Sequence, residues 1–264
     1  MRLNLMIPYY YTLKTRCKDK ISKITYILSN IIPIILYNIT ILKEEKLIYI
    51  FLNSIFVLCS YISIYEIGYI YNDVITIEKE ENPTLRLKSK DLNIIKENLE
   101  NIFLSKVFIS IFLMIIIKLI AQKINIFLYF ILCISTLLVY YVHNNVRNTK
   151  INYLTFFLLS TLRFFTPISL FLFKESIFIY LFDIVVINSL IRNFEIIGYK
   201  KYYVKNLNIY LRRHGFRVIY YIFLITFNLI NNKGIVYYML FYRTLIYILN
   251  FFRNYLKKGK KIKV

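Results

Sequence analysis

Long apolar runs recur along the whole chain and leave little choice of fold. Each run has about 17–25 residues, the length that an α-helix needs to cross a hydrocarbon layer about 30 Å thick. Hydrophobic residues make up 58% of the 264 residues. The breaks between runs come about every twenty residues, whereas polar residues interrupt a soluble core roughly every ten. The sequence therefore predicts an all-α, polytopic membrane helix bundle with about eight transmembrane helices, forming a single domain over residues 1–264. The predicted spans are 25–42, 46–71, 102–121, 124–142, 153–173, 176–191, 215–231 and 234–252.

Basic residues alternate between the connections of these spans, and the formal net charge is +21. The N-terminal segment, the loops after spans two, four and six, and the C-terminal tail together hold 26 Lys and Arg, against 6 in the other turns. This asymmetry follows the positive-inside rule and explains the charge without nucleic-acid binding. We expect both termini in the cytoplasm, cytoplasmic loops at 72–101 and 192–214, a basic tail at 253–264 and contacts with anionic lipid head groups. The Ile, Lys, Asn and Tyr usage is typical of AT-rich bacterial coding and predicts a bacterial inner membrane; the oligomeric state stays open.

Cysteine and histidine are too sparse to build a site of their own. The three cysteines, Cys17, Cys59 and Cys133, are far apart along the chain. The two histidines, His143 and His214, fall in different predicted loops. The sequence therefore predicts neither disulfides nor a thiolate or histidine metal site.

Carboxylates recur at a spacing of seven where the second span meets the first long loop. Glu66, Asp73 and Glu80 share one face if the helix continues past the membrane edge, because seven residues are close to two turns. Asn72 lies beside that stripe, and such oxygen ligands suit Mg²⁺ together with substrate phosphate oxygens. Arg86 follows where it can meet a phosphate. The alternative is a polar helix cap and a solvated loop, but Glu66 lies inside an apolar run, where ionisable groups tend to be functional.

This stretch resembles the UbiA-type prenyltransferases, which carry N-D-x-x-D-x-x-x-D in the cytoplasmic loop after helix two, followed by an Arg. Asn72, Asp73 and Glu80 match the first, second and last ligand positions, and Arg86 matches the trailing Arg. Thr76 stands where the middle Asp is expected. The resemblance implies a UbiA-like fold, Mg²⁺ bound by Asp73, Asn72 and Glu80, and a polyprenyl diphosphate donor. The family usually has nine spans, one more than we predict here.

The second long loop departs from the family pattern, which has another D-x-x-x-D there. Its sequence contains no aspartate but carries the run Gly-Tyr-Lys-Lys-Tyr. This run resembles the branch that transfers phosphoribose onto polyprenyl phosphate. The resemblance implies that Tyr199, Lys200, Lys201 and Arg192 help Arg86 to bind phosphates. The alternative is a basic connector that obeys the positive-inside rule.

Three more ionisable residues lie at mid-depth in the predicted bundle. Arg163, Asp183 and Arg243 are all roughly 13–15 Å from the nearest predicted cytoplasmic helix end. A tight turn joins the helices of Arg163 and Asp183, so an ion pair between these two is a reasonable hypothesis. Such a pair either lines a central cavity or fixes helix packing, and the second role is the one that we favour.

These observations predict a Mg²⁺-dependent transferase that moves a prenyl group from a polyprenyl diphosphate to an acceptor in or at the membrane. Phosphoribosyl transfer to polyprenyl phosphate is the first alternative. A transporter, or a membrane protein that has lost catalysis, is the second. No internal repeat is visible and only 5 Gly are present, which argues against most carrier folds.

Overall fold

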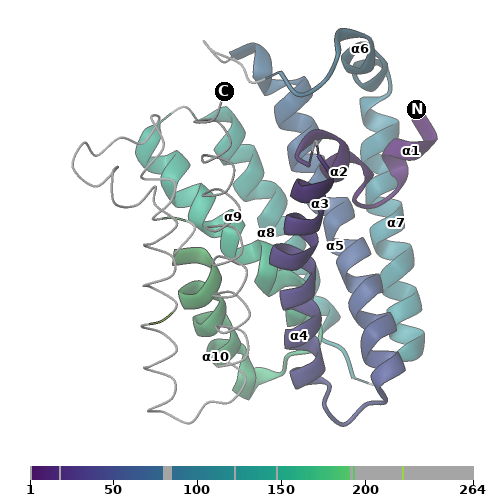
Figure 1. Cartoon of the computed structure of the whole chain (residues 1–264), viewed down its shortest axis with the longest axis vertical. Coiled ribbons are helices and arrows are strands. Elements are labelled where there is room, and N and C mark those ends of the chain that lie inside the picture. Colours follow the sequence, from purple (N-terminus) through teal and green to yellow (C-terminus); the bar gives the residue numbers. More distant parts are fainter. Residues whose placement is uncertain are drawn as a thin grey trace, which may run out of the picture. The chain divides into compact units, whose positions relative to one another are not determined.

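The computed structural model describes residues 2–17, 19–79, 85–121, 123–146 and 148–190, together with Asn193 and Ile222. Over these residues the secondary structure is helical, without strands (Figure 1). The chain divides into two compact units, Met1–Ile177 and Phe178–Val264. The α-helices are α1 (Arg2–Met6), α2 (Tyr10–Thr15), α3 (Lys20–Tyr26), α4 (Ile32–Ile41), α5 (Leu47–Val74), α6 (Ser89–Glu97), α7 (Leu99–Ile120), α8 (Ile126–Asn145), α9 (Thr149–Ser169) and α10 (Lys174–Ile184). A π-helical turn, η1 (Ile27–Ile31), joins α3 to α4, a 3₁₀ turn, η2 (Thr76–Lys79), follows α5, and a π-helical segment, η3 (Val185–Leu190), follows α10.

Within the described residues, five helical stretches are long and apolar enough to cross a membrane, which confirms a polytopic helical membrane protein. They are Lys20–Ile41, Leu47–Val74, Leu99–Ile120, Ile126–Asn145 and Lys150–Ser169. These stretches coincide with the first five predicted spans. The sixth predicted span matches a shorter apolar helix, Ser176–Leu190. The predicted spans at 215–231 and 234–252, and the tail at 253–264, lie outside the described residues, so the number eight stays a prediction.

Short polar residues cap the starts of three helices of the first unit, α3, α8 and α9. Asp19 begins α3 with a reciprocal capping box, because its carboxylate accepts from the Ser22 amide while the Ser22 hydroxyl accepts from the Asp19 amide. Asn125 accepts from the Leu128 amide at 3.2 Å at the start of α8. Asn148 does the same for the first amides of α9. Three of the five candidate membrane spans therefore begin at a residue that caps them.

The N-terminal segment, which the charge pattern marks only as basic, folds into the first unit as α1 and α2. The chain reverses between them at Tyr9, whose φ of 68° is the only positive value among the described non-glycine residues. Leu5 and Tyr11 are completely buried, in one apolar cluster with Ile70 of α5 and Ile102 of α7. Figure 1 shows α1 and α2 at the same end of this unit as α6. The segment is thus part of the core rather than a solvated leader.

The predicted loop 72–101 contains a short amphipathic helix, α6. It ends at Glu97, and α7 starts at Leu99, a few residues before the predicted span 102–121. Ile95 is fully buried in the same apolar cluster as Leu5 and Tyr11. The apolar face of α6 therefore packs on the protein.

Helix α5 is the centre of the first unit and packs against α7 and α8 through small and polar residues. The hydroxyl of Ser60 lies 2.9 Å from that of Ser110 in α7 and 2.8 Å from that of Tyr129 in α8. The carbonyl of Gly68 accepts from the Asn144 amide at 3.2 Å. Small residues and hydrogen bonds between helices are what hold bundles together in a lipid environment.

Candidate functional site

Asp73, at the last turn of α5, is the centre of a buried network of hydrogen bonds and ion pairs. Arg16 donates to the Asp73 carboxylate from both terminal nitrogens, from Nη1 to Oδ2 at 2.8 Å and from Nη2 to Oδ1 at 3.1 Å. Arg86 donates from Nη1 to Oδ1 at 2.9 Å. Tyr11 donates its hydroxyl to Oδ2 at 2.8 Å, and Asn72 donates to Oδ1 at 3.2 Å. The side chain of Asp73 is 1% exposed, so these donors replace its water shell.

The protonation state of Tyr11 follows from its surroundings. Burial, together with the charge of the Asp73 carboxylate that its hydroxyl contacts, raises the pKa of the Tyr11 phenol well above its usual value. The phenol is therefore protonated at neutral pH and acts as a donor to Asp73. Arg16 also rests on an aromatic face, with its guanidinium carbon 4.4 Å from the centre of the Tyr69 ring. Both groups from the N-terminal segment are thus held in fixed orientations.

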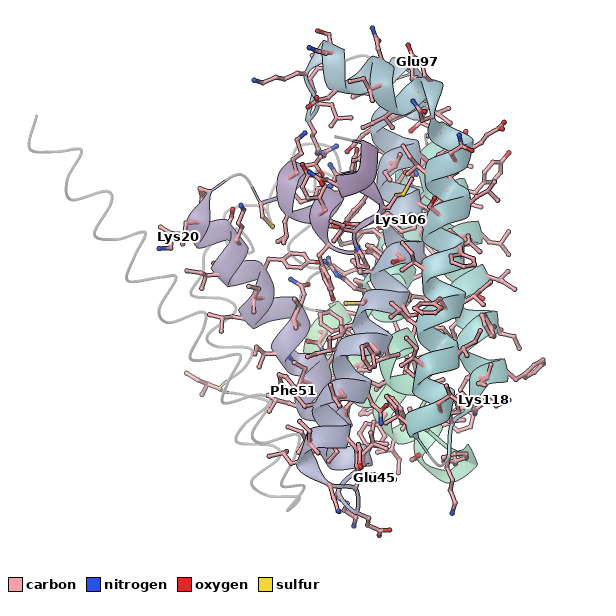
Figure 2. All side chains as sticks on the ribbon, turned by 90° about the vertical axis from the view of Figure 1, so that its right-hand side faces the viewer. Lys20, Glu45, Phe51, Glu97, Lys106 and Lys118 are labelled. Carbon is pink, nitrogen blue, oxygen red and sulfur yellow. The ribbon has the colours of Figure 1, made fainter. Side chains whose placement is uncertain are left out.

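Glu66, two turns earlier on the same face of α5, has a separate partner. The Lys106 ammonium of α7 donates to Glu66 Oε2, and both side chains are fully buried. Lys106 also donates to the Ile7 carbonyl at 3.2 Å, and the Thr12 amide donates to Glu66 Oε1 at 2.7 Å. Figure 2 shows Lys106 at the level of the N-terminal helices, with Lys118 near the other end of α7. The N-terminal segment therefore closes over both carboxylates of α5.

The polar core of the first unit carries an excess of positive charge. Three cations, Arg16, Arg86 and Lys106, face the two carboxylates Asp73 and Glu66. One formal positive charge is left over. An excess cation in a partly buried site favours the binding of an anion.

A second buried cation, Arg163 of α9, lies among tyrosines. Its Nη2 donates to the Tyr26 hydroxyl at 2.7 Å. Its guanidinium carbon is 5.0 Å from the Tyr26 ring centre and 5.3 Å from that of Tyr65. Arg163 is 8% exposed. Asp183 belongs to the second unit, so the predicted pair between Arg163 and Asp183 stays a prediction.

Three of the predicted magnesium ligands, Glu66, Asn72 and Asp73, lie within the described residues, and these three do not fit a shared metal ion as they are arranged. Both oxygens of Asp73 already accept from donors, two of which are guanidinium groups, and Asn72 Oδ1 accepts from the Thr76 hydroxyl at 3.2 Å. Glu66 lies seven residues from Asp73, about 10 Å along the helix axis, too far for both to bind one ion directly. Among the described residues, no three His, Cys, Asp or Glu side chains are grouped so that they could hold a metal.

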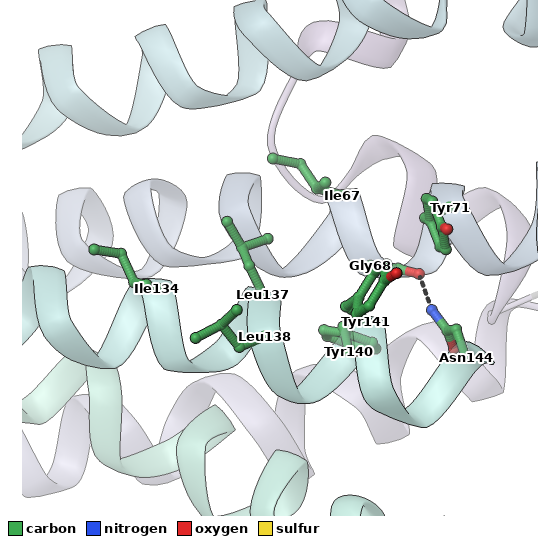
Figure 3. Close-up of a pocket in the computed structure, with 9 residues that line it drawn as sticks. All are labelled: Ile67, Gly68, Tyr71, Ile134, Leu137, Leu138, Tyr140, Tyr141 and Asn144. Atoms are coloured by element: carbon green, nitrogen blue, oxygen red, sulfur yellow. Dashed lines mark hydrogen bonds between the residues drawn. The ribbon is translucent and has the colours of Figure 1, made fainter. Parts of the chain in front are cut away.

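An apolar groove runs along the surface between α5 and α8 (Figure 3). Its volume is about 430 Å³. Tyr71 lies at the polar end, two residues before Asp73, beside Asn144. The rest of the lining is almost entirely hydrocarbon and aromatic: Ile67, Gly68, Ile134, Leu137, Leu138, Tyr140 and Tyr141. Since both helices are candidate membrane spans, the groove suits a hydrocarbon chain.

The structure brings together only part of the predicted site. Glu66, Asn72, Asp73 and Arg86 are described, and Arg86 pairs with Asp73 directly, a contact that the sequence did not predict. Helix α5 ends at Val74, so of the three predicted carboxylates only Glu66 and Asp73 lie on this helix. The remaining predicted site residues lie outside the described residues: Glu80, Arg192, Tyr199, Lys200 and Lys201. Arg243 and most of the loop 192–214 lie there too.

Four groups that the sequence does not single out complete the network: Tyr11, Thr12, Arg16 and Lys106. Arg16 gives the same sequence signal as any basic residue that sets topology. Lys106 lies only four residues inside a predicted span, where a lysine can reach the interface. The cluster of polar residues around Tyr11 is the sequence feature that could have pointed to this part of the network.

Comparison of the chain with protein-family models, with curated proteins and with solved structures finds no match. The class that the fold defines is an integral membrane helix bundle, on the evidence of its five long apolar helices within the described residues.

Proposed function

We propose that this protein is a UbiA-like membrane transferase that binds a polyprenyl diphosphate at the Asp73 end of α5 and transfers its prenyl group to an acceptor. The observation that carries the proposal is the convergence of Arg16 and Arg86 on Asp73, at 2.8 and 2.9 Å. The two arginines come from segments 70 residues apart in the sequence. Two guanidinium groups on one carboxylate leave a net positive charge where the resemblance to the family expects a diphosphate.

An apolar groove near the same end of α5 suits the other part of such a ligand. A polyprenyl diphosphate has an anionic head and a long hydrocarbon tail. Arg16 and Arg86 suit the head, and the groove between α5 and α8, which starts beside Tyr71, suits the tail. The two features lie near the same end of α5 but on different sides of it, Asp73 towards the N-terminal segment and the groove towards α8, so a ligand that uses both must pass around that end of the helix.

In the proposed reaction, the bond between the first prenyl carbon and the diphosphate oxygen breaks, and the diphosphate leaves with the electron pair. Arg16 and Arg86 neutralise the charge that develops on the leaving group. The acceptor forms a bond to the same carbon and gives up a proton to solvent. The described residues supply no fitted magnesium site at Asp73, so Mg²⁺ stays a prediction that the assay below includes.

The test is pyrophosphate release by the purified protein supplied with membrane lipid extract, in Mg²⁺ and in EDTA. Separate reactions offer prenyl diphosphates and phosphoribosyl diphosphate. Asp73→Asn removes the charge that orients both arginines, and we expect it to lower release by about 10²–10³-fold. The matched control is Asp91→Asn, the same change at an exposed ion pair of α6, which we expect to leave release unchanged.

The donor that gives release selects the branch of the family. Release with phosphoribosyl diphosphate alone would replace prenyl transfer by phosphoribosyl transfer. No release with any donor, from protein shown to be folded, would overturn the proposal in favour of a transporter or a non-catalytic membrane protein.

A further inference from the structure

We infer that Arg16 and Arg86, held on Asp73, form a clamp that binds a diphosphate without a divalent metal ion. This inference rests on the proposed function and names how its ligand is recognised. The carboxylate that the family resemblance assigns to magnesium is here the anchor of two guanidinium groups.

Asp73 is far less exposed to solvent than the two arginines that it holds. Asp73 is 1% exposed, whereas the side chains of Arg16 and Arg86 are 18% and 28% exposed. A ligand that arrives from outside therefore meets the guanidinium groups before it meets the carboxylate. A phosphate oxygen fits that order, and a metal ion does not, because it would approach Asp73 past two fixed positive charges.

Each guanidinium keeps donors beyond those that Asp73 uses. An arginine has five N–H donors in a rigid planar fork. Arg86 donates to Asp73 from Nη1, and Arg16 donates one N–H from each of its two terminal nitrogens. The other donors of the two forks can bind phosphoryl oxygens in pairs. Two forks on one anchor match the two phosphoryl groups of a diphosphate.

The clamp is preorganised by contacts that hold Arg16 from several directions. Its guanidinium lies over the Tyr69 ring, and Tyr11 donates to the same carboxylate oxygen as Arg16 Nη1. A donor fixed before binding loses little entropy when the ligand arrives. Arg16 and Arg86 can therefore supply the charge neutralisation that a metal supplies elsewhere.

The experiment is calorimetric titration of the full-length, detergent-purified protein with inorganic pyrophosphate, once in EDTA and once in Mg²⁺. We expect binding in EDTA. Arg16→Lys and Arg86→Lys keep the charge that Asp73 needs but lose the fork, so each should weaken binding by at least about tenfold. Lys14→Gln, a nearby lysine that does not contact Asp73, should change the affinity by less than about twofold. Circular dichroism of each variant checks that it is folded.

Two outcomes would overturn the inference: binding that appears only in Mg²⁺, or lysine variants that bind as tightly as the parent chain. The proposed transferase fails in a different way. Pyrophosphate binding in EDTA with no turnover in the release assay would remove the transferase and leave the clamp. Turnover together with binding that requires Mg²⁺ would leave the transferase and remove the clamp.

Discussion

The two sides of α5 are held to the rest of the first unit by different forces. Towards α7 and the N-terminal segment, the buried carboxylates of Glu66 and Asp73 each form ion pairs. Towards α8, the backbone itself approaches a ring at Gly68, where a Cβ atom would come within 2.3 Å of Tyr140. The polar side depends on a few strong partners, because a buried charge without one is costly. The apolar side depends on shape, since lipid competes equally well for hydrocarbon surface.

The largest effect is expected from breaking the polar side at Lys106. Lys106→Met leaves the Glu66 carboxylate buried beside one backbone amide, and it should lower the free energy of unfolding in mixed micelles by about 3–5 kcal/mol. The matched control is Lys118→Met on the same helix, because Lys118 is exposed (Figure 2). We expect that change to stay within about 0.5 kcal/mol.

A second variant sharpens this test. Glu66→Gln in the Lys106→Met background removes the unpaired charge and keeps an acceptor for the Thr12 amide. It should recover much of the lost stability. If Lys106→Met costs no more than Lys118→Met, the ion pair is not what holds α7 on this side of α5.

A substitution on the apolar side, at Gly68, should lower the free energy of unfolding by less. In Gly68→Ala the new methyl group meets Cγ and both Cδ atoms of the Tyr140 ring at 2.3–2.6 Å. These atoms lie near the base of the ring, so the side chain cannot swing away, and overpacking of this kind costs about 1–3 kcal/mol. The measurement is again the free energy of unfolding in mixed micelles.

A double-mutant cycle assigns that cost. Tyr140→Leu alone loses the edge-on contact with Tyr65, whose ring centre is 4.9 Å away. Gly68→Ala should cost clearly less in the Tyr140→Leu background than in the parent chain. Equal costs in both backgrounds would mean that Gly68→Ala acts through the helix backbone and not through a clash with Tyr140.

The sequence predicted the helices well but not which of them are buried. Helix α5 and helix α8 are both apolar throughout, yet 56% of the most apolar stretch of α5 is buried against 22% of that of α8. In a membrane, a residue that faces lipid and one that faces a neighbouring helix are equally hydrophobic, so hydropathy carries no information about the difference. Polar residues within the spans, such as Ser60 and Glu66, were the better guide, because both are buried between helices.

For the site, the sequence located the end of α5 but not the groups that complete it. Asn72, Asp73 and Arg86 lie close together in the sequence, so a local pattern could group them in one hypothesis. Tyr11 and Arg16 are 62 and 57 residues away from Asp73, and no local pattern encodes such a contact. The positive-inside rule explains every basic residue of the N-terminal segment in the same way, so the sequence could not distinguish Arg16 from its neighbours.

The smallest effect is expected at the edge of the polar side, in the pair between Lys14 and Asp91. The two side chains are 34% and 21% exposed and 3.0 Å apart. Exposed ion pairs contribute about 0–1 kcal/mol, so Lys14→Gln should lower the free energy of unfolding by less than about 1 kcal/mol, and high salt should remove most of the difference. The reason is that α2 and α6 are also joined through the buried side chains of Tyr11 and Ile95. A cost well above 1 kcal/mol that persists in high salt would show that this pair, rather than the apolar cluster beneath it, fastens the N-terminal segment over Asp73.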